Sequence, residues 1–205
     1  MAIELRHIYK SFGGKQVLTN LCLILPEMGT TAIMGASGTG KTTLANILLG
    51  LVRPDHGEIR GMAGKKISAV FQEDRLLEHK SGLDNILFVL PKPRAAKAAE
   101  LLHATGLSGD ARKKTRDYSG GMKRRLALCR ALAADFDVLI LDEPFKGLDE
   151  ALKPKIMAMV KEHTRDATLI LITHDKLEGE FFGAHIIDIE APPILPNAPG
   201  TYWGA

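Results

Sequence analysis

Residues 35–43, which read Gly-Ala-Ser-Gly-Thr-Gly-Lys-Thr-Thr, constrain the fold of this chain more than any other stretch. They satisfy the pattern G-x-x-x-x-G-K-[ST], in which consecutive backbone N–H groups wrap a phosphate chain and the lysine meets the terminal phosphates. Glycine allows the tight turn and the close approach of the backbone to the ligand. The stretch therefore predicts a phosphate-binding loop between a strand and a helix.

Every residue of this loop is a candidate binding residue. Lys41 supplies a mobile positive charge, and the Thr42 hydroxyl is a hard oxygen ligand suited to Mg²⁺. The phosphate-binding loop comprises Gly35, Ala36, Ser37, Gly38, Thr39, Gly40, Lys41, Thr42 and Thr43. Residues 30–34 read as a buried strand and residues 43–49 as a helix. Because ordinary glycine-rich turns can match the same pattern, the order strand, loop, helix is what favours a phosphate site.

Composition limits what the chain can do. Its 205 residues, 45% hydrophobic and 25% charged, fit one globular unit with a sizeable core. The net charge of +3 is too small to indicate a nucleic-acid partner, and we interpret the basic runs 112–114 and 123–125 as solvated edges of helices or loops. Two distant cysteines, Cys22 and Cys129, and a first segment unlike a signal peptide favour a reducing, cytoplasmic compartment. The sequence contains no uninterrupted apolar run of about 18 residues, so no membrane span is predicted.

Strand and helix patterns alternate along the rest of the chain. Strands are predicted at residues 2–8, 21–25, 57–61, 66–71, 138–141 and 168–172, with a turn at 13–14. Helices are predicted over residues 83–107 with a break at Pro91 and Pro93, over 119–134, and over about 150–164. This alternation predicts an α/β fold with a doubly wound sheet that binds ligands at the carboxyl ends of its strands. The Pro-rich residues 191–205 read as an irregular tail without chemistry.

Two carboxylates follow the apolar strand at residues 138–141. In a sheet that also carries the phosphate loop, Asp142 can join the Mg²⁺ shell and Glu143 can take a proton from an attacking water. Adjacent carboxylates at a strand end can equally cap the next helix. Together with the phosphate loop, however, they favour a nucleotide-hydrolysing site.

These motifs and five other features give the chain a resemblance to the nucleotide-binding subunit of ABC transporters. Phe12 is similar to the aromatic residue that stacks on adenine in that family, although tyrosine is commoner there. Gln72 resembles the glutamine that reaches Mg²⁺ and the γ-phosphate. Residues 118–122, Tyr-Ser-Gly-Gly-Met, resemble the signature Leu-Ser-Gly-Gly-Gln, with Met122 lacking the amide. Residues 147–149 resemble the loop after the catalytic carboxylate, and His174 resembles the switch histidine.

The resemblance covers residues 1–190 and implies a P-loop NTPase fold of the ABC type, with a RecA-like core, an antiparallel β subdomain and an α-helical subdomain inserted at about 73–134. It implies hydrolysis of ATP with Mg²⁺, with the catalytic residues Lys41, Gln72, Glu143 and His174 and the metal ligands Thr42, Gln72 and Asp142. It also implies that Ser119, Gly120 and Gly121 bind ATP held by the phosphate loop of a second subunit. Two identical or different subunits would thus sandwich two nucleotides head to tail. Read alone, Ser-Gly-Gly is an ordinary helix N-cap.

The family also implies partners and a location: permease subunits in the membrane, and a peripheral position on its cytoplasmic face. Residues 71–77, 84–86 and 143–145 resemble the branch that imports nitrate, sulfonates or taurine, which adds an extracellular solute-binding protein. In this family a nucleotide-binding subunit on a chain of its own favours import over export. Two alternatives stay open. Soluble ATPases of the superfamily act in DNA repair or on ribosomes, and usually carry long coiled coils or two fused cassettes, while a P-loop kinase offers no role for residues 118–122.

Overall fold

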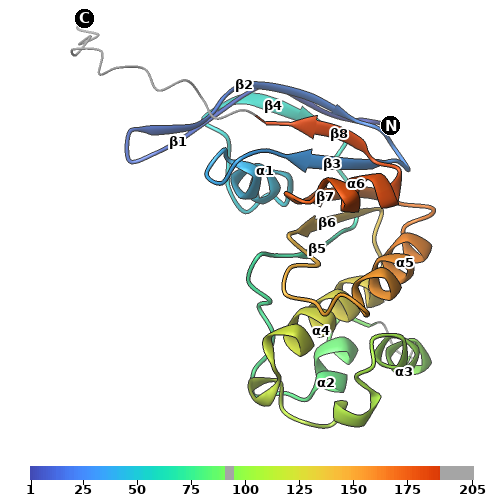
Figure 1. The fold of residues 1–205 in the computed structure, drawn as a ribbon. Helices are drawn as coiled ribbons and strands as arrows, with labels where there is room; N and C mark the ends of the chain where they lie inside the picture. The colour runs from blue at the N-terminus through green and yellow to red at the C-terminus, as the bar shows by residue number, and fades with distance from the viewer. Residues whose placement is uncertain (91–94, 190–205) are drawn as a thin grey trace, which may run out of the picture.

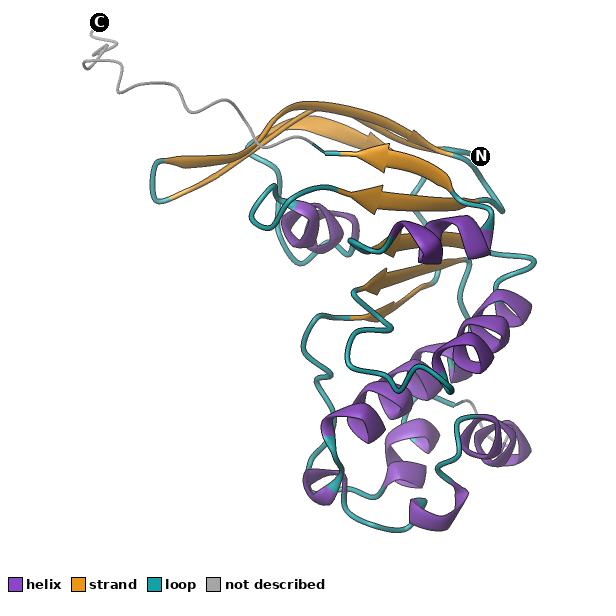
Figure 2. Ribbon diagram, viewed as in Figure 1, coloured by secondary structure: helices purple, strands orange, loops and turns teal. Residues whose placement is uncertain are grey.

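A computed structural model describes residues 1–90 and 95–189 of the chain. Its strands form an upper part, and most of its helices gather in a lower part that extends to one side (Figures 1 and 2). The predicted helix break at Pro91 and Pro93 and the predicted tail at residues 191–205 lie outside the described residues.

The strands form two sheets. The antiparallel sheet has the order β2-β1-β4 and consists of β1 (Ile3–Phe12), β2 (Lys15–Leu25) and β4 (His56–Arg60). The second sheet is parallel, has the order β5-β6-β7-β3-β8, and consists of β3 (Thr30–Met34), β5 (Ile67–Val70), β6 (Val138–Asp142), β7 (Thr168–Ile172) and β8 (His185–Asp188). The helices are α1 (Lys41–Leu48), α2 (Gly82–Leu87), α3 (Ala95–Ala104), α4 (Gly120–Ala133), α5 (Lys153–His163) and α6 (Lys176–Phe182), with short 3₁₀ turns at Ser108–Asp110 and Thr115–Asp117. The predicted α/β fold with a parallel sheet is confirmed.

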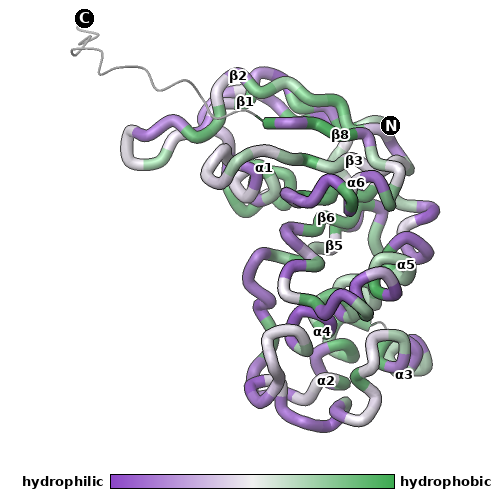
Figure 3. Tube along the Cα trace, in the orientation of Figure 1, coloured by the Kyte–Doolittle hydropathy of each residue, from purple (hydrophilic) through white to green (hydrophobic). Residues whose placement is uncertain are grey.

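The parallel sheet separates two hydrophobic cores. On β6, Val138 and Ile140 pack with α1 and the antiparallel sheet, whereas Leu139 and Leu141 pack with the helices α2 to α5. Successive side chains of a strand point to opposite faces, so a strand buried on both faces must be apolar throughout. Figure 3 shows hydrophobic positions along the strands and hydrophilic ones along the loops below them. Both cores therefore fix the carboxyl ends of β3, β6 and β7 relative to one another.

The N-terminal hairpin is longer than the sequence predicts. β1 and β2 extend to Phe12 and Lys15, on either side of the predicted glycine turn. The extra residues are mostly half-buried or exposed, so their strand structure comes from pairing with each other and not from burial on one face. Hydrophobic alternation, the signal used for prediction, is therefore weak there.

Helix α6 and strand β8 are absent from the sequence predictions. α6 begins after Asp175, whose side chain accepts a hydrogen bond from the Leu177 amide at 3.0 Å, and it ends at Gly183 in the left-handed conformation. These are an N-cap and a C-terminal glycine, both readable in a sequence. Because α6 has seven residues and β8 has four, neither is long enough to show a clear period.

The two cysteines have contrasting surroundings. Cys22 is exposed on β2, whereas Cys129 is buried in α4, and burial raises the pKa of its thiol to about 12. Since the thiolate is the reactive form, we predict that a thiol reagent at pH 8 modifies Cys22 in the native chain and Cys129 only after unfolding. Mass spectrometry with and without denaturant counts the modified thiols. The Cys22→Ser variant should remain unmodified while native, and rapid native labelling of that variant would contradict the prediction.

Candidate functional site

The loop at residues 35–43 joins the carboxyl end of β3 to the first turn of α1. Gly35 and Gly40 have φ angles of 138° and 96°. A Cβ atom on Gly35 would clash with the carbonyl oxygen of Ile189, and one on Gly40 would lie 2.9 Å from that of Val17. Only glycine fits at these two positions. The loop thereby brings its backbone to the positive end of the α1 dipole, where anions bind.

The side chain of Lys41 folds back over this loop. Its Nζ atom donates hydrogen bonds to the carbonyl oxygens of Gly35 and Ala36, both at 2.7 Å. Thr39 is buried beneath the loop, and its hydroxyl donates to Ala36 O at 3.0 Å. Thr39 thus supports the loop from inside, while Lys41 concentrates positive charge on its ligand-facing side.

A hydroxyl and a carboxylate meet where α1 approaches the end of β6. The Thr42 Oγ1 atom donates to Asp142 Oδ2 at 2.8 Å. Burial raises the pKa of Asp142, the Thr42 hydrogen bond lowers it, and the neighbouring Glu143 carboxylate raises it. Two hard oxygen donors beside a phosphate loop are the ligand type that Mg²⁺ prefers. The residues present therefore fit the predicted magnesium site.

Glu143 leaves the sheet in a left-handed backbone conformation, with φ of 50°. Such a conformation is uncommon for a residue with a Cβ atom and concentrates at functional sites. It turns the Glu143 side chain towards β7, where Oε1 lies 2.8 Å from Nδ1 of His174. In the parallel register Asp142 pairs with Ile172, so the residues that follow the two strands are neighbours. Glu143, the predicted general base, and His174, the predicted switch histidine, are thus in direct contact.

These groups border one cleft of about 500 Å³. Most of the sequence-predicted residues line it, namely Gly35, Ala36, Ser37, Gly38, Gly40, Lys41, Thr42, Thr43, Gln72, Asp142, Glu143 and His174. Val17 and Lys146 also line it and were not predicted. Lys146 lies three residues after Glu143, so a search of the sequence for basic residues near the two carboxylates could have found it. Val17 comes from the hairpin, and nothing in the sequence indicates that the hairpin reaches the cleft.

Thr39 lies beneath the loop and does not line the cleft, and four other predicted residues lie elsewhere. Phe12 stands at the end of β1, half exposed, with Lys10 Nζ 5.1 Å from its ring centre. Ser119, Gly120 and Gly121 start α4, where the Ser119 side chain accepts a hydrogen bond from the Met122 amide at 3.3 Å. Ser119 and Gly120 are exposed and Gly121 is half-buried, and none of the three lines the cleft of its own chain.

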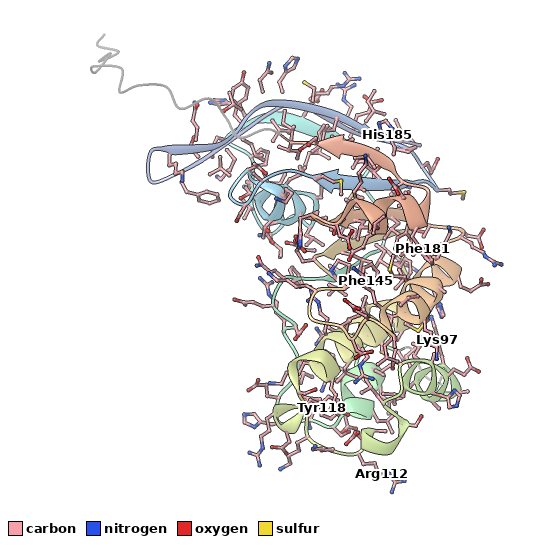
Figure 4. The ribbon with its side chains drawn as sticks, viewed as in Figure 1. Lys97, Arg112, Tyr118, Phe145, Phe181 and His185 are labelled. Carbon is pink, nitrogen blue, oxygen red and sulfur yellow. The ribbon has the colours of Figure 1, made fainter. Side chains whose placement is uncertain are left out.

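Tyr118 occupies the packing position that the signature gives to leucine. Its ring is buried among the helices below the sheet (Figure 4), and its hydroxyl donates to Asp110 O at 2.7 Å. Burial raises the pKa of the Tyr118 hydroxyl. A Cβ atom on Gly82 would collide with that hydroxyl, so this tyrosine and this glycine fit each other. Met122 is partly buried and packs against the same core.

Arg124 corrects our interpretation of residues 123–125 as a solvated edge. Its side chain is 5% exposed and reaches from α4 to two strand ends. It donates to Phe71 O at 2.6 Å, to Asp142 O at 2.7 Å and to Glu143 O, and it pairs with Asp74 at 3.1 Å. A guanidinium with five donors can satisfy several carbonyls that leave a sheet, as no aliphatic side chain can. Arg124 therefore helps to hold Glu143 in its left-handed conformation.

Comparison with known proteins agrees with the resemblance seen in the motifs. The model of the ABC transporter family matches residues 18–146. The sulfate/thiosulfate import ATP-binding protein CysA of Shigella flexneri is 34% identical over 99% of this chain, which spans 62% of that relative's length. The taurine import ATP-binding protein TauB of Escherichia coli O157:H7 is 32% identical over 96% of this chain and 84% of its own length. A solved dimeric bacterial ABC transporter cassette, MJ0796, superposes with a TM-score of 0.83 at 28% identity, covering 92% of this chain and 94% of its own.

The fold and the site together define a P-loop cassette with a phosphate loop, a strand-end carboxylate pair and a histidine. The chain belongs to the ABC transporter family, as the resemblance in its motifs indicated.

Proposed function

We propose that this chain is the ATP-binding and ATP-hydrolysing subunit of an ABC importer. The observation that carries the proposal is the contact of Glu143 with His174 across the cleft from the phosphate loop. A phosphate loop alone serves many reactions, whereas a carboxylate and a histidine beside it supply the groups that hydrolysis of a terminal phosphate needs. The printed names of CysA and TauB, both import ATP-binding proteins, support import as the process. A second solved form of MJ0796 holds ADP and Pi after hydrolysis, which supports the reaction.

The chemistry follows from the placement of the residues. Lys41 and the loop amides hold the negative charge of the β- and γ-phosphates. Thr42 and Asp142, with Gln72, would hold Mg²⁺, which neutralises phosphate charge when bound. Glu143 accepts a proton from the water that attacks the γ-phosphate in line, and ADP and phosphate are the products. Because His174 contacts Glu143, it can orient that carboxylate and donate to the γ-phosphate.

Two predicted contacts complete the nucleotide site. Phe12 supplies a ring for stacking on adenine, which fits its exposure at the hairpin end. Ser119, Gly120 and Gly121 bind the ATP of a second subunit, which fits their position at a helix N-terminus outside the cleft, where Ser119 and Gly120 are exposed. The dimeric form of MJ0796 supports a pair of subunits. We assign this pair a head-to-tail arrangement of identical or different subunits.

The partners we propose are permease subunits in the membrane and an extracellular solute-binding protein, with the chain on the cytoplasmic face. Among residues 1–90 and 95–189, no helix is long and apolar enough to cross a bilayer. Residues 73–77 carry partly exposed groups, including Leu77, and we assign them to the permease contact. Residues 1–190 form the cassette, with the helical subdomain at 73–134. The importer relatives favour transport over the alternative of a soluble ATPase in DNA repair or translation.

The test is hydrolysis itself. The purified chain should release phosphate from ATP when Mg²⁺ is present, and Lys41→Ala should lower turnover by about 10²–10³-fold, the usual loss when one donor to developing charge is removed. Lys155→Ala, which removes an exposed lysine of α5, is the matched control and should keep the activity. Unchanged turnover in Lys41→Ala would contradict the site, and a wild-type chain unable to hydrolyse ATP, alone or with its permease, would contradict the function.

A further inference from the structure

A cluster of charged residues joins α5 to α6 outside the cleft. Lys153, the first residue of α5, places Nζ 2.7 Å from Asp175 Oδ2 and 2.6 Å from Glu178 Oε1. Partial burial opposes the charge on Lys153, yet the two carboxylates raise its pKa overall. The Lys153 hydrogen bond lowers the pKa of Asp175. Both shifts favour the charged forms of Lys153 and Asp175, which their ion pair requires.

This cluster contacts both sequence neighbours of His174, namely Thr173 and Asp175. Thr173 Oγ1 donates to Glu178 Oε2 at 2.6 Å, and the Asp175 amide donates to Thr173 Oγ1 at 3.0 Å. Thr173 and Glu178 are 1% and 5% exposed, whereas the side chain of His174 is 67% exposed. The exposed His174 thus lies between two residues that are held by hydrogen bonds. Its ring makes the 2.8 Å contact with Glu143.

At its other end the cluster begins just after residues 147–149, which resemble the loop after the catalytic carboxylate in the family. The Lys153 amide donates to Asp149 O at 2.9 Å, and the Ala151 amide donates to Asp149 Oδ1 at 2.9 Å. The backbone of Lys153 is therefore hydrogen-bonded to Asp149, while its side chain contacts the turn that carries His174.

A second contact between the same helices offers a comparison. Lys161, two turns along α5, donates to Phe181 O and lies 5.1 Å from the centre of the Phe181 ring. Figure 4 shows Phe181 at the boundary between α6 and α5. This pair holds the helices together without touching residues 173–175, so it can separate helix packing from the position of His174.

We propose that Lys153 is a positioning residue, which holds residues 173–175 so that His174 meets Glu143. The proposal rests on the proposed function, in which His174 acts at the γ-phosphate. The ion pair of Lys153 with Asp175, whose side chain is 31% exposed, contributes little to overall stability. Glu178 is buried, so the loss of Lys153 also lowers stability by leaving this carboxylate without its cation. The effect on His174 is therefore measured on the folded chain.

Kinetics provide the first test. Lys153→Met keeps the length of the side chain but removes its charge, and should lower kcat about 10- to 100-fold with little change in KM for ATP, because a small misplacement of a catalytic group carries such a loss. Lys153→Arg should restore most of the activity, and Lys161→Met should keep it. In a His174→Ala background, Lys153→Met should add no further loss, because both changes act through one group. An equal loss in that background would overturn the proposal.

The second readout does not depend on hydrolysis. The NMR signal of the His174 ring Cε1–H group, assigned by its disappearance in His174→Ala, should move in Lys153→Met and stay in place in Lys161→Met. An unmoved signal in Lys153→Met overturns the proposal whether or not the chain hydrolyses ATP. A wild-type chain without ATPase activity whose His174 signal responds as expected would instead contradict the proposed function alone.

Discussion

Replacement of Glu143 by glutamine should lower ATP hydrolysis by about 10²–10⁴-fold, the usual contribution of a positioned general base. Glutamine keeps the size of the side chain and an oxygen that can meet His174 Nδ1 at the observed position, so the site should remain assembled. KM for ATP should change little, since the Glu143 carboxylate acts on water and not on the bound phosphates. Phosphate release at saturating ATP and Mg²⁺ measures the effect.

The same variant should accumulate as a dimer with ATP. If the γ-phosphate bridges the phosphate loop of one subunit and residues 119–121 of the other, blocking hydrolysis preserves the bridge. Size-exclusion chromatography with ATP should show the dimer, and Ser119→Arg added to Glu143→Gln should abolish it by filling the space of the facing phosphate.

Glu162→Gln, the same chemical change on an exposed residue of α5, is the control and should resemble the wild type in activity and in size. A Glu143→Gln variant that hydrolyses ATP at the wild-type rate would show that another group is the base. One that binds ATP and stays monomeric would show that the pair of subunits needs the permease to form.

Replacement of Arg124 by leucine should destabilise the fold by about 3–5 kcal/mol, the range seen when one partner of a buried charged contact is removed. The carbonyl oxygens of Phe71, Asp142 and Glu143 would lose their donor, and unpaired buried acceptors are costly. The fraction that still folds should also hydrolyse ATP slowly, because Glu143 would lose a contact that holds its left-handed backbone.

Urea unfolding followed by circular dichroism measures the loss of stability as a lower midpoint. Lys123→Leu is the matched control from the neighbouring position of α4. Lys123 pairs at 3.3 Å with the exposed Glu78, and such a surface pair contributes at most about 1 kcal/mol. An Arg124→Leu variant with the wild-type midpoint would contradict the role of Arg124, whereas Arg124→Lys should be intermediate because an ammonium cannot reach all the acceptors.

The sequence by itself determined the phosphate loop, the strands that carry it and the class of the site. Residues 35–43 combine glycines with a lysine and a threonine, and few other uses need those types at that spacing. The apolar runs of β6 and β7 likewise predicted buried strands, and the rule that such a sheet binds ligands at the carboxyl ends of its strands put Asp142 and Glu143 beside the phosphate loop. His174 was assigned by its resemblance to the family. These inferences succeeded because they depend on local patterns and on a rule about parallel sheets.

Only the tertiary structure decided the features that depend on contacts distant in sequence. Arg124 reads as one of three consecutive basic residues, yet it is buried because α4 presents it to strand ends that lie 18 and 53 residues away. The left-handed conformation of Glu143 and the approach of Val17 to the cleft have no local signal either. The contact of Lys153 with Asp175 and Glu178 requires α5 and α6 to be packed first. Charge and burial at such positions follow from the neighbours that folding brings, and the residue type alone leaves them undetermined.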